Sequence, residues 1–152
     1  SMTRAYAAFE RLEVKDKAER VVYLRFLSNI SSQLQEHDKT IGYATEVSIH
    51  ALTDDDRGFA YSMLGAAYRH KGEDDKAIGY YDKALAIQLK ALGAEHPSVA
   101  ASYFNIGAAY KAKGDKTKAM AYLLKAKAIY LKMLGAEHPQ TKNAQGWIDS
   151  LK

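Results

Sequence analysis

Residues 58–68 read Gly-Phe-Ala-Tyr-Ser-Met-Leu-Gly-Ala-Ala-Tyr, and 42 positions later residues 100–110 read Ala-Ala-Ser-Tyr-Phe-Asn-Ile-Gly-Ala-Ala-Tyr. The similarity continues downstream at the same offset. Gly72 recurs as Gly114, and the run Leu-Gly-Ala-Glu-His-Pro occupies residues 92–97 and again 134–139. A fixed period of a few tens of residues is typical of stacked repeats, because one unit cannot bury its apolar face alone. The sequence therefore predicts a repeat protein.

Each copy divides into two segments with apolar residues at helical spacing, separated by Gly72 or Gly114. Gly93 should end the second helix and Pro97 should open the next hairpin, because glycine is favoured after a helix and proline at its first position. We therefore expect an all-α stack of helix hairpins, with full repeats over residues 55–96 and 97–138. The adjacent acids Asp54, Asp55 and Asp56 are interpreted as helix-capping residues and not as a metal cluster.

A weaker copy precedes these two repeats. Residues 38–43 match residues 75–80 at an offset of 37, which predicts a degenerate repeat over residues 17–53 with Asp16 as the first N-cap. A short amphipathic helix is expected over residues 3–13 and a capping helix over 139–152. In that last helix the positions facing away from the stack are Gln145, Asp149 and Lys152, so the stack is expected to end there.

The repeats resemble the tetratricopeptide repeat between residues 21 and 152. The residues that carry the resemblance are Tyr61, Leu64, Gly65, Tyr68, Gly72, Ala77, Tyr81 and Ala84, with their counterparts 42 positions later. The longer period, with Leu-Gly-x-x-His-Pro and then an Asn, is similar to the repeats of kinesin light chains over residues 58–139. The resemblance implies a right-handed superhelix in which Gly65 and Ala77 allow two helices to cross closely. It also implies a protein-interaction module, although no heptad coiled coil for motor attachment is present.

The resemblance further implies a concave groove lined by the first helix of each hairpin. The groove residues that we expect to bind a peptide or a partner helix are Phe26, Asn29, Phe59, Met63, Arg69, His70, Asn105 and Lys111. Asn105 is expected to hydrogen-bond a peptide backbone, and Phe59 and Met63 to pack an aromatic or apolar anchor. Arg69 and Lys111 would favour an acidic peptide. The carboxylate clamp that grips chaperone C-termini is not expected, because Asn105 alone fits its pattern.

No catalytic motif is present. The chain has no cysteine and lacks a phosphate-binding loop, a nucleophile elbow and a His-Glu-x-x-His zinc motif, so we expect no enzyme activity and no cofactor. His96 and His138 occupy equivalent positions of two repeats, which explains them better than metal binding does. No signal peptide or long apolar run is seen, so a soluble cytoplasmic protein without membrane contact is expected.

The formal charge of +4 is unevenly distributed. Residues 98–134 contain seven lysines and one acidic residue, whereas residues 36–56 contain six acidic residues and one lysine. Such polarity would suit head-to-tail packing, and we keep a structural module that self-associates into dimers or head-to-tail oligomers as the alternative function. Nucleic acid is an unfavoured partner, because the lysines are expected to be spread around the helices and not interleaved with aromatic residues.

Overall fold

The computed structural model describes residues 3–4 and 16–152. This part contains seven α-helices: α2 (Lys17–Gln33), α3 (His37–His50), α4 (Asp54–His70), α5 (Asp74–Leu92), α6 (Pro97–Ala112), α7 (Lys116–Leu134) and α8 (Pro139–Asp149). The helix expected over residues 3–13 lies outside the described residues except for its first two positions. Helix α5 ends directly before Gly93, as the sequence predicts.

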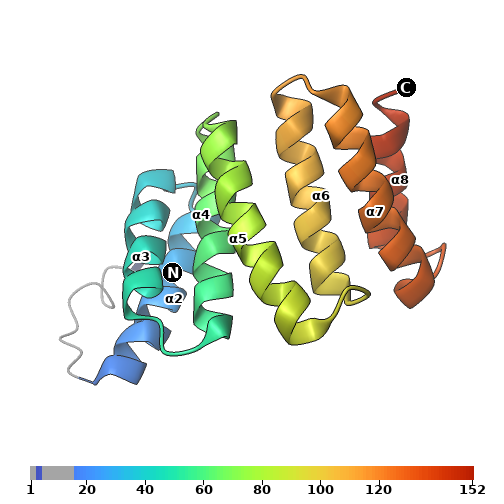
Figure 1. Cartoon of the computed structure of the whole chain (residues 1–152). Helices are drawn as coiled ribbons and strands as arrows, with labels where there is room; N and C mark the ends of the chain where they lie inside the picture. Colours follow the sequence, from blue (N-terminus) through green and yellow to red (C-terminus); the bar gives the residue numbers. More distant parts are fainter. Residues whose placement is uncertain (1–2, 5–15) are drawn as a thin grey trace.

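The helices form a row of hairpins (Figure 1). Helices α2 and α3, α4 and α5, and α6 and α7 pair as hairpins, and α8 packs on α7 at the far end. The first helices also contact one another directly, since α2 touches α4 and α4 touches α6. The second helices instead contact the first helix of the next hairpin. The first helices are therefore the more closely spaced layer and form the inner side of the predicted all-α superhelix.

The close crossing within each full repeat depends on a glycine opposite a large buried side chain. A Cβ atom added at Gly65 would lie 2.6 Å from the Tyr81 ring, and one at Gly107 would lie 2.9 Å from Leu123 Cγ. Tyr81 is 1% exposed and Leu123 is fully buried. Any larger residue at either glycine would therefore force the two helices apart, as the resemblance predicts for Gly65.

The first hairpin solves the same crossing with different residues. Ser28 occupies the glycine position and is fully buried, while Ala44 replaces the large residue of the second helix. The Ser28 hydroxyl donates to the Leu24 carbonyl oxygen at 2.8 Å. Ser31 and Thr40 form a buried hydroxyl–hydroxyl hydrogen bond of 2.9 Å. In this hairpin a serine replaces the glycine and an alanine replaces the large residue. The two facing side chains together therefore still allow the helices to cross closely.

The helix ends explain the repeated histidines. Gly93 and Gly135 end α5 and α7 with φ of +84° and +89°, the left-handed region that glycine adopts without strain. His96 and His138 are the N-caps of α6 and α8, and each Nδ1 accepts a hydrogen bond from a backbone N–H two residues later. The sequence itself shows that these histidines repeat, but their capping role was not predicted.

The expectation that Asp54, Asp55 and Asp56 cap α4 is only partly correct. The N-cap is Thr53, whose side chain accepts from the Asp56 N–H while Asp56 accepts from the Thr53 N–H. Asp54 and Asp55 instead pair with arginines, because the reciprocal cap already satisfies the helix start.

Helix α8 covers the end of the stack. Ala144, Ile148 and Leu151 are buried and pack on residues of α7. At the positions expected to face away from the stack, Gln145 donates to Asp149 at 2.7 Å, and Lys152 pairs with Asp149 at 3.4 Å. The outer side of α8 is therefore polar.

Candidate functional site

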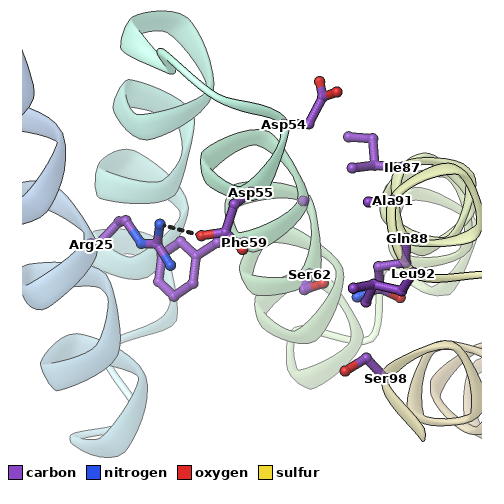
Figure 2. A pocket seen from close by; sticks show the side chains of 11 residues that line it. Arg25, Asp54, Asp55, Phe59, Ser62, Ile87, Gln88, Ala91, Leu92 and Ser98 are labelled. Carbon is purple, nitrogen blue, oxygen red and sulfur yellow. Dashed lines mark hydrogen bonds and ion pairs between the residues drawn. The ribbon is translucent and has the colours of Figure 1, made fainter. Parts of the chain in front are cut away.

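The inner layer of first helices contains a cleft of about 450 Å³ between α4, α5 and α6 (Figure 2). It is lined by Arg25, Asp54, Asp55, Gly58, Phe59, Ser62, Ile87, Gln88, Ala91, Leu92 and Ser98. In Figure 2 the α5 side chains point across the opening toward Ser62 on α4. The wall that α5 contributes is mostly apolar, so the cleft can accept a non-polar side chain.

Arg25 on α2 forms one edge of this cleft. Its Nη1 atom donates to Asp55 Oδ2 and to Asp56 Oδ1, each at 2.8 Å, and its guanidinium lies 4.5 Å from the centre of the Phe59 ring. The arginine thereby ties the first hairpin to the start of α4. Sequence reasoning gave Arg25 no such role, because its partners are 30 and 31 residues away.

The Asp56 carboxyl is ionised at neutral pH. Burial by itself raises its pKa, but hydrogen bonds from Arg25, Thr53 and the Leu52 N–H outweigh burial and hold the pKa below the ordinary 3.8. The carboxylates of Asp54 and Asp55 line the opening and are more exposed than Asp56. This edge of the cleft is therefore rich in negative charge, although Arg25 offsets part of it.

Repeat alignment explains why the cleft exists. Ser62 and Gln88 correspond, 42 positions on, to Phe104 and Tyr130. Tyr130 is 3% exposed, and Phe104 packs edge-on against Trp147 with 5.2 Å between ring centres. In the third hairpin two aromatic rings thus occupy the space that small or polar side chains leave open in the second. The offset comparison was available from the sequence, but the groove was expected to involve first helices only.

Of the predicted groove residues only Phe59 lines this cleft, and several of the others are partly or fully accessible. Asn105 is half-buried, and its side chain makes no hydrogen bond to any residue in the described part of the chain. Met63 is half-buried, Asn29 is exposed, and Phe26 is 37% exposed. Phe59 is partly buried against the core between α2 and α4. It therefore presents only part of its ring to a ligand.

Two of the predicted groove residues, His70 and Lys111, contact other side chains of the protein. Burial raises the pKa of Tyr81 and the neighbouring Arg69 opposes this rise, while the buried Arg69 Nε has no hydrogen-bond partner among the described residues. His70 stacks on His37 with 5.1 Å between ring centres, and burial, Arg69 and His37 lower the pKa of His70. Lys111 contacts Ser150 and Trp147 at the end of the stack.

Lys111 Nζ donates to Ser150 Oγ at 2.7 Å and lies 4.8 Å from the Trp147 ring centre. Trp147 in turn packs on Phe104. The lysine therefore helps to hold the capping helix, and only the remaining hydrogen-bonding capacity of its ammonium group is available for an acidic ligand.

The expectation that lysines lie apart from aromatic rings is wrong. Tyr110 and Tyr122 stack with 5.6 Å between ring centres, Lys118 lies 5.2 Å from the Tyr110 centre, and Lys125 lies 5.4 Å from the centres of Tyr103 and Tyr122. The second hairpin repeats this cluster with Tyr61, Tyr68, Tyr80, Lys76 and Lys83. Because the ring faces contact lysines and one another, they are not open for base stacking.

The described residues contain no group of three or more His, Asp or Glu side chains arranged to hold a metal ion. Within the same part of the chain, no helix combines the length and apolar character needed to cross a membrane.

Comparison with solved structures identifies proteins of the same fold. BtubC from P. vanneervenii is 20% identical with a TM-score of 0.78, over 99% of this chain and 62% of that protein. A putative kinesin light chain from Podospora anserina with nearly identical TPR-like repeats is 23% identical with a TM-score of 0.76, over 99% of this chain and 73% of that one. A Rap protein complexed with competence and sporulation factor is 18% identical with a TM-score of 0.74, over 91% and 38%. The chain thus spans less than two thirds of BtubC and of the Rap protein.

No curated protein sequence shows significant similarity to the chain. The sequence model of the tetratricopeptide repeat, however, matches residues 56–132, which is half of the chain and covers most of the two full repeats. With the hairpin crossings at Gly65 and Gly107, this match shows that the chain belongs to the tetratricopeptide repeat family.

Proposed function

We propose that this protein is a non-enzymatic interaction module that binds a peptide or a partner helix on its inner surface. The observation that carries the proposal is the open cleft of about 450 Å³ on the layer of first helices. Ligand sites are typically concave and mostly apolar, with a few polar groups that fix orientation. The cleft has this composition, with Ile87 and Leu92 beside Ser62 and Gln88.

Asn105 would fix the ligand backbone. An amide side chain offers both an acceptor and two donors, so it can bond the C=O and N–H groups of an extended peptide. Because Asn105 has no hydrogen-bond partner in the described part of the chain, these groups are available to a ligand. Phe59 and Met63 would extend the apolar surface beside the cleft and receive an aromatic or apolar anchor.

The charged residues divide between the two rims of the inner surface. Asp54 and Asp55 lie at the start of α4, whereas Arg69 and Lys111 lie in the last turns of α4 and α6. A preference for acidic ligand residues would therefore be confined to the rim with Arg69 and Lys111. The existing contacts of Lys111 make its share of that preference modest.

The comparisons support a binding role at the level of the fold. The Rap protein with 18% identity was solved with competence and sporulation factor bound, so a stack of this type can hold a ligand. A groove of this size would give roughly micromolar affinity, about 8 kcal/mol.

The test is selection of ligands from a random peptide library, followed by affinity measurement by calorimetry. Selected peptides should share a large apolar residue. Asn105→Ala should weaken binding about five- to tenfold, the effect of losing one or two hydrogen bonds. Ser62→Phe should weaken it more, because this substitution installs the residue that fills the equivalent space in the third hairpin.

Asn143→Ala is the matched control, since Asn143 is an exposed residue on α8. The proposal fails if peptides bind equally well to wild type, Asn105→Ala and Ser62→Phe. Light scattering over a wide concentration range tests the alternative, self-association, which predicts an apparent mass that rises with concentration.

A further inference from the structure

The outer helices of the three hairpins differ sharply in charge. Helix α3 carries Asp38, Lys39 and Glu46 as its acidic and lysine residues. Helix α5 carries three aspartates and three lysines, and therefore has no net charge. Helix α7 carries five lysines and no acidic residue. The third outer helix is thus strongly positive, although it is a copy of a neutral one.

The difference arises at four aligned positions: Leu85 of α5 is replaced by Lys127 of α7, and the three aspartates of α5 are lost. The 42-residue offset pairs the aspartates of α5 with three non-acidic residues of α7: Asp74 with Lys116, Asp75 with Thr117, and Asp82 with Leu124. One of these replacements places a large apolar side chain on the surface, because Leu124 is 49% exposed. An isolated exposed leucine is common, but a contiguous exposed apolar patch marks an interaction site.

Most of the α7 lysines have no carboxylate partner. Lys132 pairs with Glu95, but no other α7 lysine lies within 4.0 Å of a carboxylate oxygen in the described part of the chain. Lys118 and Lys125 lie over tyrosine rings, which orient an ammonium group without neutralising its charge. The positive charge of this helix is therefore available to a partner.

An apolar stripe runs between these lysines. Ala121, Leu124, Ala128 and Leu131 are all exposed and follow the spacing of three and four residues that places side chains on one face of a helix. Leu131 is 45% exposed and, with Lys127, also lines a cleft of about 440 Å³ between α7 and α8. Figure 1 shows these two helices side by side at the end of the row.

This pattern matches that of one helix in a coiled coil. Leu124 and Leu131 are seven residues apart, about 10 Å along the helix, and Lys125 and Lys132 follow them directly at flanking positions. A helix that packs on such a stripe needs apolar residues at the same heptad spacing. Opposite charges at its flanking positions would pair with the lysines.

A second copy of this chain does not supply that partner. All six acidic residues of 36–56 already pair with basic side chains, in the pairs Glu36–Lys39, Asp38–Lys71, Glu46–Arg20, Asp54–Arg57, Asp55–Arg25 and Asp56–Arg25. These basic side chains offset the negative charge of residues 36–56. Charge polarity therefore no longer favours head-to-tail packing. Two α7 helices facing each other would bring their lysines together, which is repulsive.

From these observations we propose that the outer face of α7 docks an acidic amphipathic helix of a different protein. The apolar residues of that helix pack along Leu124, Ala128 and Leu131, and its acidic flanks pair with Lys118, Lys125 and Lys127. This surface is separate from the inner cleft, so one molecule can hold two partners at once.

The probe is a synthetic three-heptad peptide with leucine at the a and d positions and glutamate at the e and g positions. Fluorescence anisotropy measures its affinity for the intact protein, and NMR chemical-shift mapping locates it. We expect shifts along the exposed residues of α7. Leu124→Asp, which restores the residue type of α5, should weaken binding at least tenfold, and Lys125→Glu should act in the same direction.

Thr45→Asp is the matched control. Thr45 is the exposed residue of α3 that aligns with Asp82 and Leu124, so the same aspartate is introduced at the equivalent position of another outer helix. It should leave the affinity unchanged. Circular dichroism checks that all three variants fold, and Ser62→Phe should not affect this peptide, which separates this test from that of the inner cleft.

Several results would overturn the proposal: no binding of the glutamate peptide, equal binding of a version with lysine in place of glutamate, or shifts confined to α4 and α6. Equal affinity for poly-glutamate, which is not helical at neutral pH, would show a site for any polyanion. Binding to vesicles of phosphatidylcholine and phosphatidylserine, lost in Lys125→Glu, would show a membrane-surface site instead.

Discussion

The second and third hairpins are two copies of one helical framework that differ on both surfaces. On the inner side, the second hairpin leaves a cleft beside Ser62, whereas Phe104 fills the equivalent space in the third. On the outer side, α5 carries equal numbers of aspartates and lysines, whereas α7 carries lysines and no acidic residue. The shared framework shows that these surfaces can change without altering the helix crossings. The residues that set the fold are therefore different from those that we propose bind partners.

Substitutions at the helix crossing within each hairpin should change the stability of the protein most. Tyr81 is 1% exposed and faces Gly65, so Tyr81→Ala would leave a large cavity. We expect it to lower the free energy of unfolding by about 3–5 kcal/mol, the usual cost of truncating a buried aromatic residue. Urea denaturation followed by circular dichroism measures the change.

Tyr80→Ala is the control for this prediction, because Tyr80 is the adjacent residue and is only half-buried. A loss that is equal for the two variants would show that Tyr81 has no special role at the crossing.

The glycine on the opposite helix should give the next largest effect. In Gly65→Ala the added methyl group would lie 2.6 Å from two atoms of the Tyr81 ring, which is closed in and cannot move aside. We expect a loss of about 1–3 kcal/mol from overpacking, even though alanine favours a helix over glycine by about 1 kcal/mol. The same denaturation measurement applies.

Gly79→Ala provides the contrast, because nothing lies within 4 Å of an added Cβ at Gly79 on the outer side of α5. That variant should gain up to about 1 kcal/mol from helix propensity. If Gly65→Ala is as stable as Gly79→Ala, the helices do not cross as closely as described.

These two glycines also show what the sequence could predict. The fixed offset and the pattern around Gly65 predict the hairpins, their order and the close crossing, because those features depend on residues that the two full copies share. The cleft was not predicted, because it depends on positions where the copies differ, Ser62 against Phe104 and Gln88 against Tyr130. The contacts of Arg25 and Lys111 were also missed, since their partners lie 30 or more residues away in sequence. The assignment of Asn105 and the other groove residues to a ligand remains a prediction.

The first hairpin is joined to the second by the ion pair between Arg25 and Asp56. The stability that this pair contributes should depend on pH. Asp56 is 8% exposed and accepts hydrogen bonds from Arg25, Thr53 and Leu52, which lower its pKa below 3.8. A carboxyl group with a lowered pKa in the folded state stabilises that state above its unfolded pKa. The stabilisation is lost as the pH falls through the folded value.

Asp56→Asn should therefore destabilise the protein at pH 7 by about 1 kcal/mol, the typical net contribution of a hydrogen bond. The difference from wild type should shrink as the pH is lowered below about 4, where the wild-type carboxyl itself becomes protonated. Urea denaturation at a series of pH values measures it. Asp55→Asn is the control, because Asp55 also pairs with Arg25 but its side chain is 81% exposed. A pH-independent difference for Asp56→Asn would mean that the residue acts through packing and the helix cap, and that its charge does not join the first hairpin to the second.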